Sequence, residues 1–233
     1  MLDKANRTAA ELASENGKPG VAKFIADYKA DANTRNRIRS IALDTVHDGA
    51  DENGIDETNS LHAAAEEGNI EVVRSLLELG ADVNGRDTYN AIPLDRAAAK
   101  GNLDVVRLLI ERGAEIDSRD QWGWTPLHSA SRYGHLEVVR ALVDHGAFLN
   151  ARTRQQWTPI YLSAYNRYLE VVKLLLEHGA DVHAMSGEGE TPYELLLQAG
   201  DREIEGLLRE HGAGRAARER FDNFLVMVEL MSD

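Results

Sequence analysis

DQWGWTPLHSASRYGHLEVVRALVDHGAFLNAR, residues 120–152, is the stretch from which the rest of the chain can be understood. Thr125 can cap a helix, and Pro126 after it suits a first helical position, where no hydrogen bond is lost. Gly134 and Gly146 are each placed to end a helix, because glycine adopts the positive φ of a C-terminal cap without strain. The stretch therefore predicts a turn, a helix, a second turn, a second helix and a loop.

The second predicted helix carries a single apolar stripe. Its apolar residues are spaced three and four apart, as in a helix that buries one face: Leu136, Val138, Val139, Leu142 and Val143. In the first helix, Ala130 and Ser131 are small enough for another helix to approach closely. A unit of this size cannot bury its own apolar face, so it needs neighbouring copies of itself.

Copies of this unit recur at steps of 33 residues. The leucine position is taken by Leu61, Leu94, Leu127, Ile160 and Tyr193. The position that ends the first helix is taken by Gly68, Gly101, Gly134, Arg167 and Gly200. The glycine that ends the second helix recurs as Gly80, Gly113, Gly146, Gly179 and Gly212. A fixed period of this length indicates a solenoid of stacked units.

The residues that define the unit match a known pattern. They are Gly123, Thr125-Pro126-Leu127-His128, Ala130, Gly134, Val138-Val139, and Gly146-Ala147 followed by Asn150. Together with the period, they resemble the ankyrin repeat, for which this length is expected. The resemblance implies an all-α solenoid of stacked helix-turn-helix units joined by β-turn or hairpin loops.

We expect six such repeats in a single domain over residues 1–233. Their predicted bounds are 3–33, 54–86, 87–119, 120–152, 153–185 and 186–213, with a helical tail at 214–233. Between the first and second repeats the spacing grows by 18 residues, which places an insertion at 34–53. The first repeat lacks the usual Pro and His, so it is either the natural end of the array or part of a longer one.

The acidic segment DGADENG, residues 48–54, lies at the end of the insertion. A calcium loop needs an acidic residue at its first ligand position and another at its twelfth. The segment has neither in place, so the pattern favours an exposed turn over a calcium site.

Two repeats depart from the pattern at informative places. Asp95 stands where the first helix of the third repeat would have His, and Tyr161 stands there in the fifth. Arg167 occupies a helix-ending position that glycine fills elsewhere, and a positive φ strains any other residue. We therefore expect local strain at Arg167.

Composition narrows the class of protein and of partner. Of the 233 residues, 43% are apolar and 28% are charged, so the chain can fold. It has no run of about 18 apolar residues and no signal segment, so no membrane partner is expected. The chain has no cysteine, which excludes disulfides and suits a cytoplasmic or nuclear setting. A net charge of −13 argues against nucleic acid.

The histidines are the first candidates for catalysis or metal binding. The resemblance assigns His62 and His128 a structural role, in which the ring bonds to Thr and to neighbouring backbone. His145, His178 and His211 recur one repeat apart, and stacked helices lie roughly 8–10 Å apart, too far to share a metal at about 2 Å. A cation at a helix C-terminus explains them more simply. We predict no catalytic residue, no metal, no cofactor and no enzyme.

Binding is the better-supported class, because each repeat has positions that the fold does not dictate. In ankyrin arrays these positions line the turn tips and the concave face. All three tryptophans of the chain fall on them, and Trp, Tyr and Arg are the residues that dominate binding hot spots. The predicted partner-binding residues are Tyr89, Trp122, Trp124, Arg132, Tyr133, Arg154, Trp157 and Tyr165.

Trp124 and Trp157 share one position in adjacent repeats, so we expect them to lie next to each other. Acidic residues lie towards both ends of the array: Asp56, Glu66, Glu67, Glu188 and Glu190. This arrangement suits a protein or peptide partner with apolar anchors and basic flanks. The alternative is that the large rings pack on the neighbouring turn and only stiffen the stack.

The predicted function is non-catalytic protein interaction, as an adaptor, scaffold or inhibitor, through the concave face and turn tips of repeats three to five. A monomer is expected. The alternative is a passive spacer or self-assembly module from a larger multidomain protein, associating through the tail. The apolar residues of that tail would either cap the open end of the sixth repeat or mediate association: Phe221, Phe224, Leu225, Val228 and Met231.

Overall fold

The computed structural model describes residues 57–199 and 201–214, in which the chain forms ten helices and no strand. The helices are α4 (Glu57–Glu67), α5 (Ile70–Glu78), α6 (Pro93–Lys100), α7 (Leu103–Glu111), α8 (Pro126–Tyr133), α9 (Leu136–Asp144), α10 (Pro159–Tyr165), α11 (Leu169–Glu177), α12 (Pro192–Ala199) and α13 (Arg202–Glu210). The first predicted repeat, the insertion with its acidic segment, and the tail beyond Gly214 lie outside the described residues.

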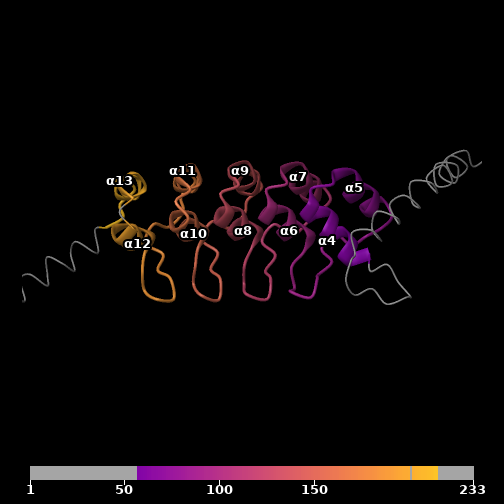
Figure 1. Cartoon of the computed structure of the whole chain (residues 1–233), viewed down its shortest axis with the longest axis horizontal. Helices are drawn as coiled ribbons and strands as arrows, with labels where there is room; N and C mark the ends of the chain where they lie inside the picture. The colour runs from indigo at the N-terminus through magenta and orange to yellow at the C-terminus, as the bar shows by residue number, and fades with distance from the viewer. Residues whose placement is uncertain (1–56, 200, 215–233) are drawn as a thin grey trace, which may run out of the picture. The chain divides into compact units, whose positions relative to one another are not determined.

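The helices pair in chain order, one pair for each of the predicted repeats two to six. The first helices, α4, α6, α8, α10 and α12, pack against one another in one row. The second helices, α5, α7, α9, α11 and α13, form a parallel row, and the loops between repeats extend away from the helices on the side of the first row (Figure 1). The all-α ankyrin-like solenoid predicted from the sequence is confirmed for this part of the chain.

Threonine and proline start the first helices α8, α10 and α12, as the sequence predicts. The Thr125 hydroxyl accepts a hydrogen bond from the backbone N–H of His128, and Pro126 is the first helical residue. Ile92 takes the threonine position in α6, and its side chain has no oxygen that could cap the helix. There the Asp95 carboxylate accepts the backbone N–H of Ile92 at 2.8 Å, so the helix still begins at the same place.

The core runs continuously from repeat to repeat. The leucine position of the unit is fully buried in each of four successive repeats: Leu61, Leu94, Leu127 and Ile160. The valine pairs of the second helices α5, α7, α9 and α11 are buried as well. Because each repeat contacts only its neighbours, the burial of one unit depends on the presence of the next.

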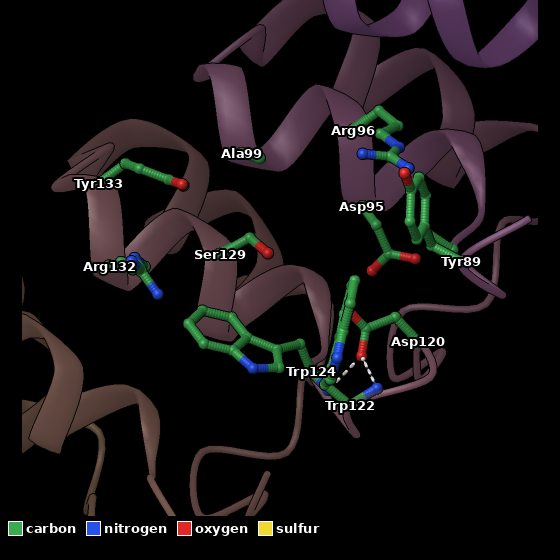
Figure 2. A pocket seen from close by; sticks show the side chains of 11 residues that line it. Tyr89, Asp95, Arg96, Ala99, Asp120, Trp122, Trp124, Ser129, Arg132 and Tyr133 are labelled. Atoms are coloured by element: carbon green, nitrogen blue, oxygen red, sulfur yellow. Dashed lines mark hydrogen bonds between the residues drawn. The ribbon is translucent and has the colours of Figure 1, made fainter. Parts of the chain in front are cut away.

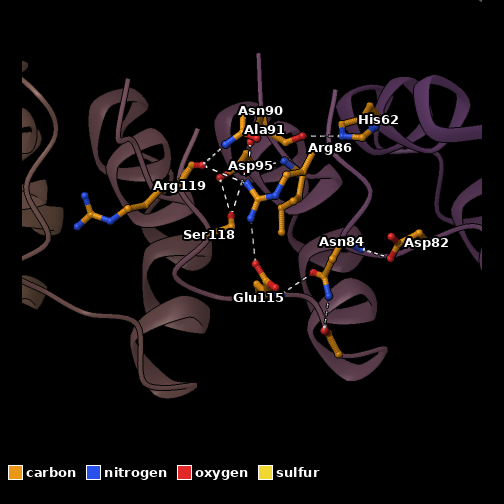
Figure 3. Close-up of polar contacts among 12 residues, drawn as sticks. His62, Asp82, Asn84, Arg86, Asn90, Ala91, Asp95, Glu115, Ser118 and Arg119 are labelled. Atoms are coloured by element: carbon orange, nitrogen blue, oxygen red, sulfur yellow. Dashed lines mark hydrogen bonds and ion pairs between the residues drawn. The ribbon is translucent and has the colours of Figure 1, made fainter. Parts of the chain in front are cut away.

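Hydrogen bonds also join the successive turns. The backbone N–H of Gln121 donates to the carbonyl of Tyr89 at 2.9 Å, and the N–H of Arg154 donates to the carbonyl of Trp122 at 2.9 Å. An arginine ladder runs beside them. In its first step Arg86 Nη1 donates to the carbonyl of Arg119 at 3.2 Å (Figure 3). In its second step Arg119 Nη1 donates to the carbonyl of Arg152 at 2.9 Å. The turns of repeats three, four and five are thus each fixed to the next by at least two hydrogen bonds.

Arg167 has the positive φ that its position predicts, at 62°. Glycine fills this place in the two preceding repeats, where Gly101 has φ 77° and Gly134 has φ 74°. A residue with a Cβ pays about 1–2 kcal/mol in this left-handed region, whereas glycine enters it freely.

Replacing Arg167 by glycine should therefore stabilise the array. Arg167→Gly is expected to raise the free energy of unfolding by about 0.5–1 kcal/mol, because relief of strain exceeds the added entropy of the unfolded chain. Urea unfolding followed by circular dichroism measures the difference. Arg167→Ala is the control: it removes the long side chain but keeps the Cβ, so a gain as large in Arg167→Ala would show that backbone strain is not the cause.

Candidate functional site

In repeats three and four, one aspartate shapes the turn that carries the aromatic side chains. Asp120 Oδ1 accepts the backbone N–H groups of Trp122 and Trp124, both at 2.8 Å. One repeat earlier, Asp87 Oδ1 accepts those of Tyr89 at 2.8 Å and Ala91 at 3.0 Å. Adjacent turns therefore have the same shape and carry their rings on the same side.

The rings of adjacent turns touch. Tyr89 and Trp122 are stacked, with ring centroids 5.7 Å apart and planes 23° from parallel. Trp124 and Trp157 meet edge to face, with centroids 6.3 Å apart and planes at 89°. The expected proximity of these two tryptophans is thus what the structure shows. Trp122 remains 44% exposed, and both members of the second pair are half-buried.

Two arginines lie over these rings. The guanidinium carbon of Arg132 is 5.2 Å from the Trp124 ring centroid and 5.7 Å from that of Tyr133. The guanidinium carbon of Arg96 is 5.4 Å from the centroid of Tyr89. These are cation–π distances, so this surface already accommodates guanidinium groups.

Two adjoining pockets open between the first helices and the turns. The Asp120 pocket, of about 320 Å³, lies between repeats three and four (Figure 2). The Trp157 pocket, of about 300 Å³, lies between repeats four and five, and Arg132 lines both. Volumes of this size are those of ordinary ligand sites.

The pockets bring together all but one of the partner-binding residues predicted from the sequence. We call these residues the aromatic face: Tyr89, Trp122, Trp124, Arg132, Tyr133, Trp157 and Tyr165. Arg154 is the exception. It is exposed, its backbone N–H donates to the carbonyl of Trp122, and it lines neither pocket.

Comparison with protein families agrees with the fold described above. A model described as "Ankyrin repeats (3 copies)" matches residues 40–120 and 96–186, more than half of the 233 residues. The chain belongs to the ankyrin-repeat family. Ankyrin repeats are generally protein-interaction modules and are typically non-catalytic. No curated protein matches the chain.

The ankyrin pattern explains the histidines as structural groups. His128 Nδ1 lies 2.8 Å from the Thr125 hydroxyl, and its Nε2 lies 3.0 Å from the carbonyls of Ala151 and Trp157. Burial lowers the pKa of His128 to about 4, so the ring is neutral at physiological pH. In the second helices, Nδ1 of His145 lies 2.7 Å from the carbonyl four residues earlier, and His178 and His211 repeat this contact.

Two further structural findings concern metal and membrane binding. Within residues 57–199 and 201–214, no group of three or more His, Cys, Asp or Glu side chains is arranged to hold a metal ion. In the same residues, every helix is too short or too polar to cross a bilayer.

Sequence reasoning missed three charged residues that line the Asp120 pocket: Asp95, Arg96 and Asp120. Arg96 Nε donates to Asp87 Oδ2 at 3.0 Å, and the two side chains form an ion pair. Asp95 departs from the family's histidine, and this departure is the one sequence signal that pointed here. The roles of Arg96 and Asp120 depend on contacts that their spacing alone does not reveal.

The carboxylates of this region differ in electrostatic environment. Asp95 is only 7% exposed, and its pKa is raised to about 7, chiefly by burial and also by the nearby charge of Asp120. Hydrogen bonds from the Ile92 N–H and the Ser118 hydroxyl act in the opposite direction (Figure 3). Burial would also raise the pKa of Asp87. There the hydrogen bonds from Arg96 and from two backbone N–H groups outweigh it, and the pKa is lowered.

The raised pKa of Asp95 makes the stability of the array depend on pH. Between pH 3.8 and about 7, the Asp95 carboxyl group keeps its proton in the folded state and loses it in the unfolded chain. Stability therefore falls as pH rises through this window and levels off above it. Asp95→Asn keeps an oxygen for the Ile92 N–H but does not titrate, so its stability relative to wild type should rise by about 2 kcal/mol between pH 5 and pH 8.

Urea unfolding of both proteins at pH 5, 6, 7 and 8 measures this difference. Asp104→Asn, an exposed substitution of the same kind on α7, should show a constant difference from wild type. Parallel pH curves for wild type and Asp95→Asn would show that Asp95 does not hold the proton.

Proposed function

We propose that repeats three to five bind a protein or peptide partner through the aromatic face, and that the chain acts without catalysis as an adaptor, scaffold or inhibitor. One observation carries the proposal. All three tryptophans of the chain lie on this face, around two adjoining pockets, and none is part of the buried core. The fold does not need them there.

The energetics of the exposed rings support this reading. The core of repeats three to five does not include them, because the leucine position and the valine pair of these repeats are already buried. Apolar surface left in water costs about 25 cal/mol per Å² relative to burial, and a partner that covers it recovers this free energy. Trp and Tyr in half-covered pockets are typical hot-spot residues.

Stiffening of the stack accounts for only part of the arrangement. The stacked pair Tyr89–Trp122 does join two turns, and such a contact contributes about 0.5–1.5 kcal/mol. However, Tyr133 is 51% exposed and Tyr165 is 63% exposed. Rings selected only for packing on a neighbour would not leave so much of their surface in water.

The charge of the chain favours a basic partner. The net charge is −13, and Glu188 lines the Trp157 pocket beside the aromatic residues. Opposite charge on a partner raises the rate of encounter and helps to fix its orientation. A peptide or protein surface with apolar anchors and basic flanks therefore suits this face.

Truncating the central tryptophans should weaken partner binding. Trp124→Ala and Trp157→Ala are each expected to lower affinity by about tenfold to thirtyfold, the effect of losing a hot-spot residue. Affinity capture with wild type, followed by biolayer interferometry on the purified captured protein, measures the change.

Phe148→Ala is the matched control, because Phe148 is an aromatic residue 57% exposed that lines neither pocket. It should leave affinity unchanged. If the partner bound both tryptophan variants as tightly as wild type while circular dichroism showed them folded, recognition through the aromatic face would be refuted.

A further inference from the structure

Asp87 shows how this array neutralises a turn aspartate. Its Oδ1 accepts the two N–H groups of the turn, and its Oδ2 faces Arg96, which donates from Nε at 3.0 Å. The same guanidinium lies over the Tyr89 ring. One arginine on α6 therefore satisfies a carboxylate and an aromatic face at the same time.

Asp120 occupies the same place one repeat later but lacks this arginine. Its Oδ1 accepts the N–H groups of Trp122 and Trp124, as Asp87 does for its own turn. The residue on α8 that corresponds to Arg96 is Ser129, which lines the pocket and carries no charge. Among the residues that the structure describes, Asp120 forms no ion pair within 4.0 Å.

The aromatic half of the arrangement is retained. Trp122 corresponds to Tyr89, and its indole borders the Asp120 pocket together with Trp124. In Figure 2 the Asp95 and Asp120 carboxylates point towards each other beside the Trp122 ring. Repeat four thus keeps the carboxylate and the ring of repeat three, with open space where the cation lies in repeat three.

We infer that the Asp120 pocket receives an arginine side chain from the partner, whose guanidinium pairs with Asp120 and lies over Trp122. The inference rests on the proposed function, since it names the group by which the partner is held. Arg96, Asp87 and Tyr89 are the template for the contact, one repeat away in the same protein.

The other charged groups of the pocket are compatible with an incoming cation. The charge of Arg96 is balanced by Asp87, and the Arg132 guanidinium is held over the rings of Trp124 and Tyr133. Asp95 lines the same pocket and adds a second carboxyl group beside Asp120. Among the described residues, the Asp120 carboxylate therefore has no cationic partner in this pocket.

Arginine suits this site better than lysine. Its planar guanidinium can present two N–H groups to one carboxylate while its face lies on a ring. Arg96 shows both contacts at once, and Arg132 shows the ring contact again on Trp124. An ammonium group is a compact, strongly hydrated charge and gains less from an aromatic surface.

Nuclear magnetic resonance tests this without a partner protein. The three tryptophans give three indole N–H signals, and Trp122→Phe assigns the one that reports on the pocket. N-acetyl-arginine amide is titrated into the folded chain, with N-acetyl-citrulline amide as a neutral probe of the same shape. Arginine amide should shift the Trp122 signal with a Kd of about 1–10 mM, as expected for so small a ligand. Citrulline amide should give no saturable shift.

Two variants locate the contact. Asp120→Asn keeps the oxygen that accepts the turn N–H groups but removes the charge, and should weaken arginine amide by about tenfold. Ser129→Arg installs the arginine that repeat three already has, and should block the probe by filling the site from within. Asp104→Asn changes the net charge equally, outside the pocket, and should bind the probe as wild type does. Backbone amide spectra verify that each variant is folded.

Several results would overturn the inference. These are the absence of a saturable shift at Trp122, equal binding of citrulline amide, tighter binding of N-acetyl-lysine amide titrated in the same way, or unchanged affinity in Asp120→Asn. None of these results would contradict the proposed function, which is tested with the tryptophan variants and a partner. If those variants weakened partner binding while the probe failed, recognition would stand and the arginine contact would be wrong.

Discussion

The burial of one repeat against the next is the constraint on which the rest of the structure depends. A pair of short helices cannot cover its own apolar stripe, so Leu94 is buried only because equivalent residues, such as Leu61 and Leu127, lie in the flanking repeats. The hydrogen bond from the Gln121 N–H to the Tyr89 carbonyl then holds neighbouring turns at one fixed offset. This offset brings rings that are 33 residues apart into contact, so the aromatic face is a consequence of how the core stacks.

Much of this arrangement could be predicted from the sequence, because it depends on periodicity. The helix pairs, the caps at Thr125 and Thr158, the positive φ of Arg167 and the proximity of Trp124 to Trp157 all follow from a residue's place in the repeat. Such features need only the knowledge that equivalent positions lie one step apart. The first predicted repeat and the tail lie outside the described residues, so those predictions stay untested.

The polar half of the candidate site could not be obtained in this way. Whether Asp87 pairs with Arg96, nine residues further on, depends on the direction of two side chains and not on a period. The raised pKa of Asp95 requires its burial to be known, and the position of Arg154 outside both pockets depends on the local course of the turn. The arginine ladder was equally hidden, although Arg86, Arg119 and Arg152 are spaced by one repeat.

A repeat protein supplies its own comparison, since each unit shows what the same backbone does with other side chains. His128 takes the position in repeat four that Asp95 has in repeat three. Its ring contacts the backbone carbonyls of Ala151 in its own repeat and Trp157 in the next. The shorter Asp95 side chain accepts hydrogen bonds from Ile92 and Ser118 instead, and its buried carboxyl group lines the Asp120 pocket. The loss of Arg96's counterpart at Ser129 occurs at the same boundary between repeats three and four. Two departures from the neighbouring repeats, each lacking a contact that the neighbour makes, therefore lie around the same pocket.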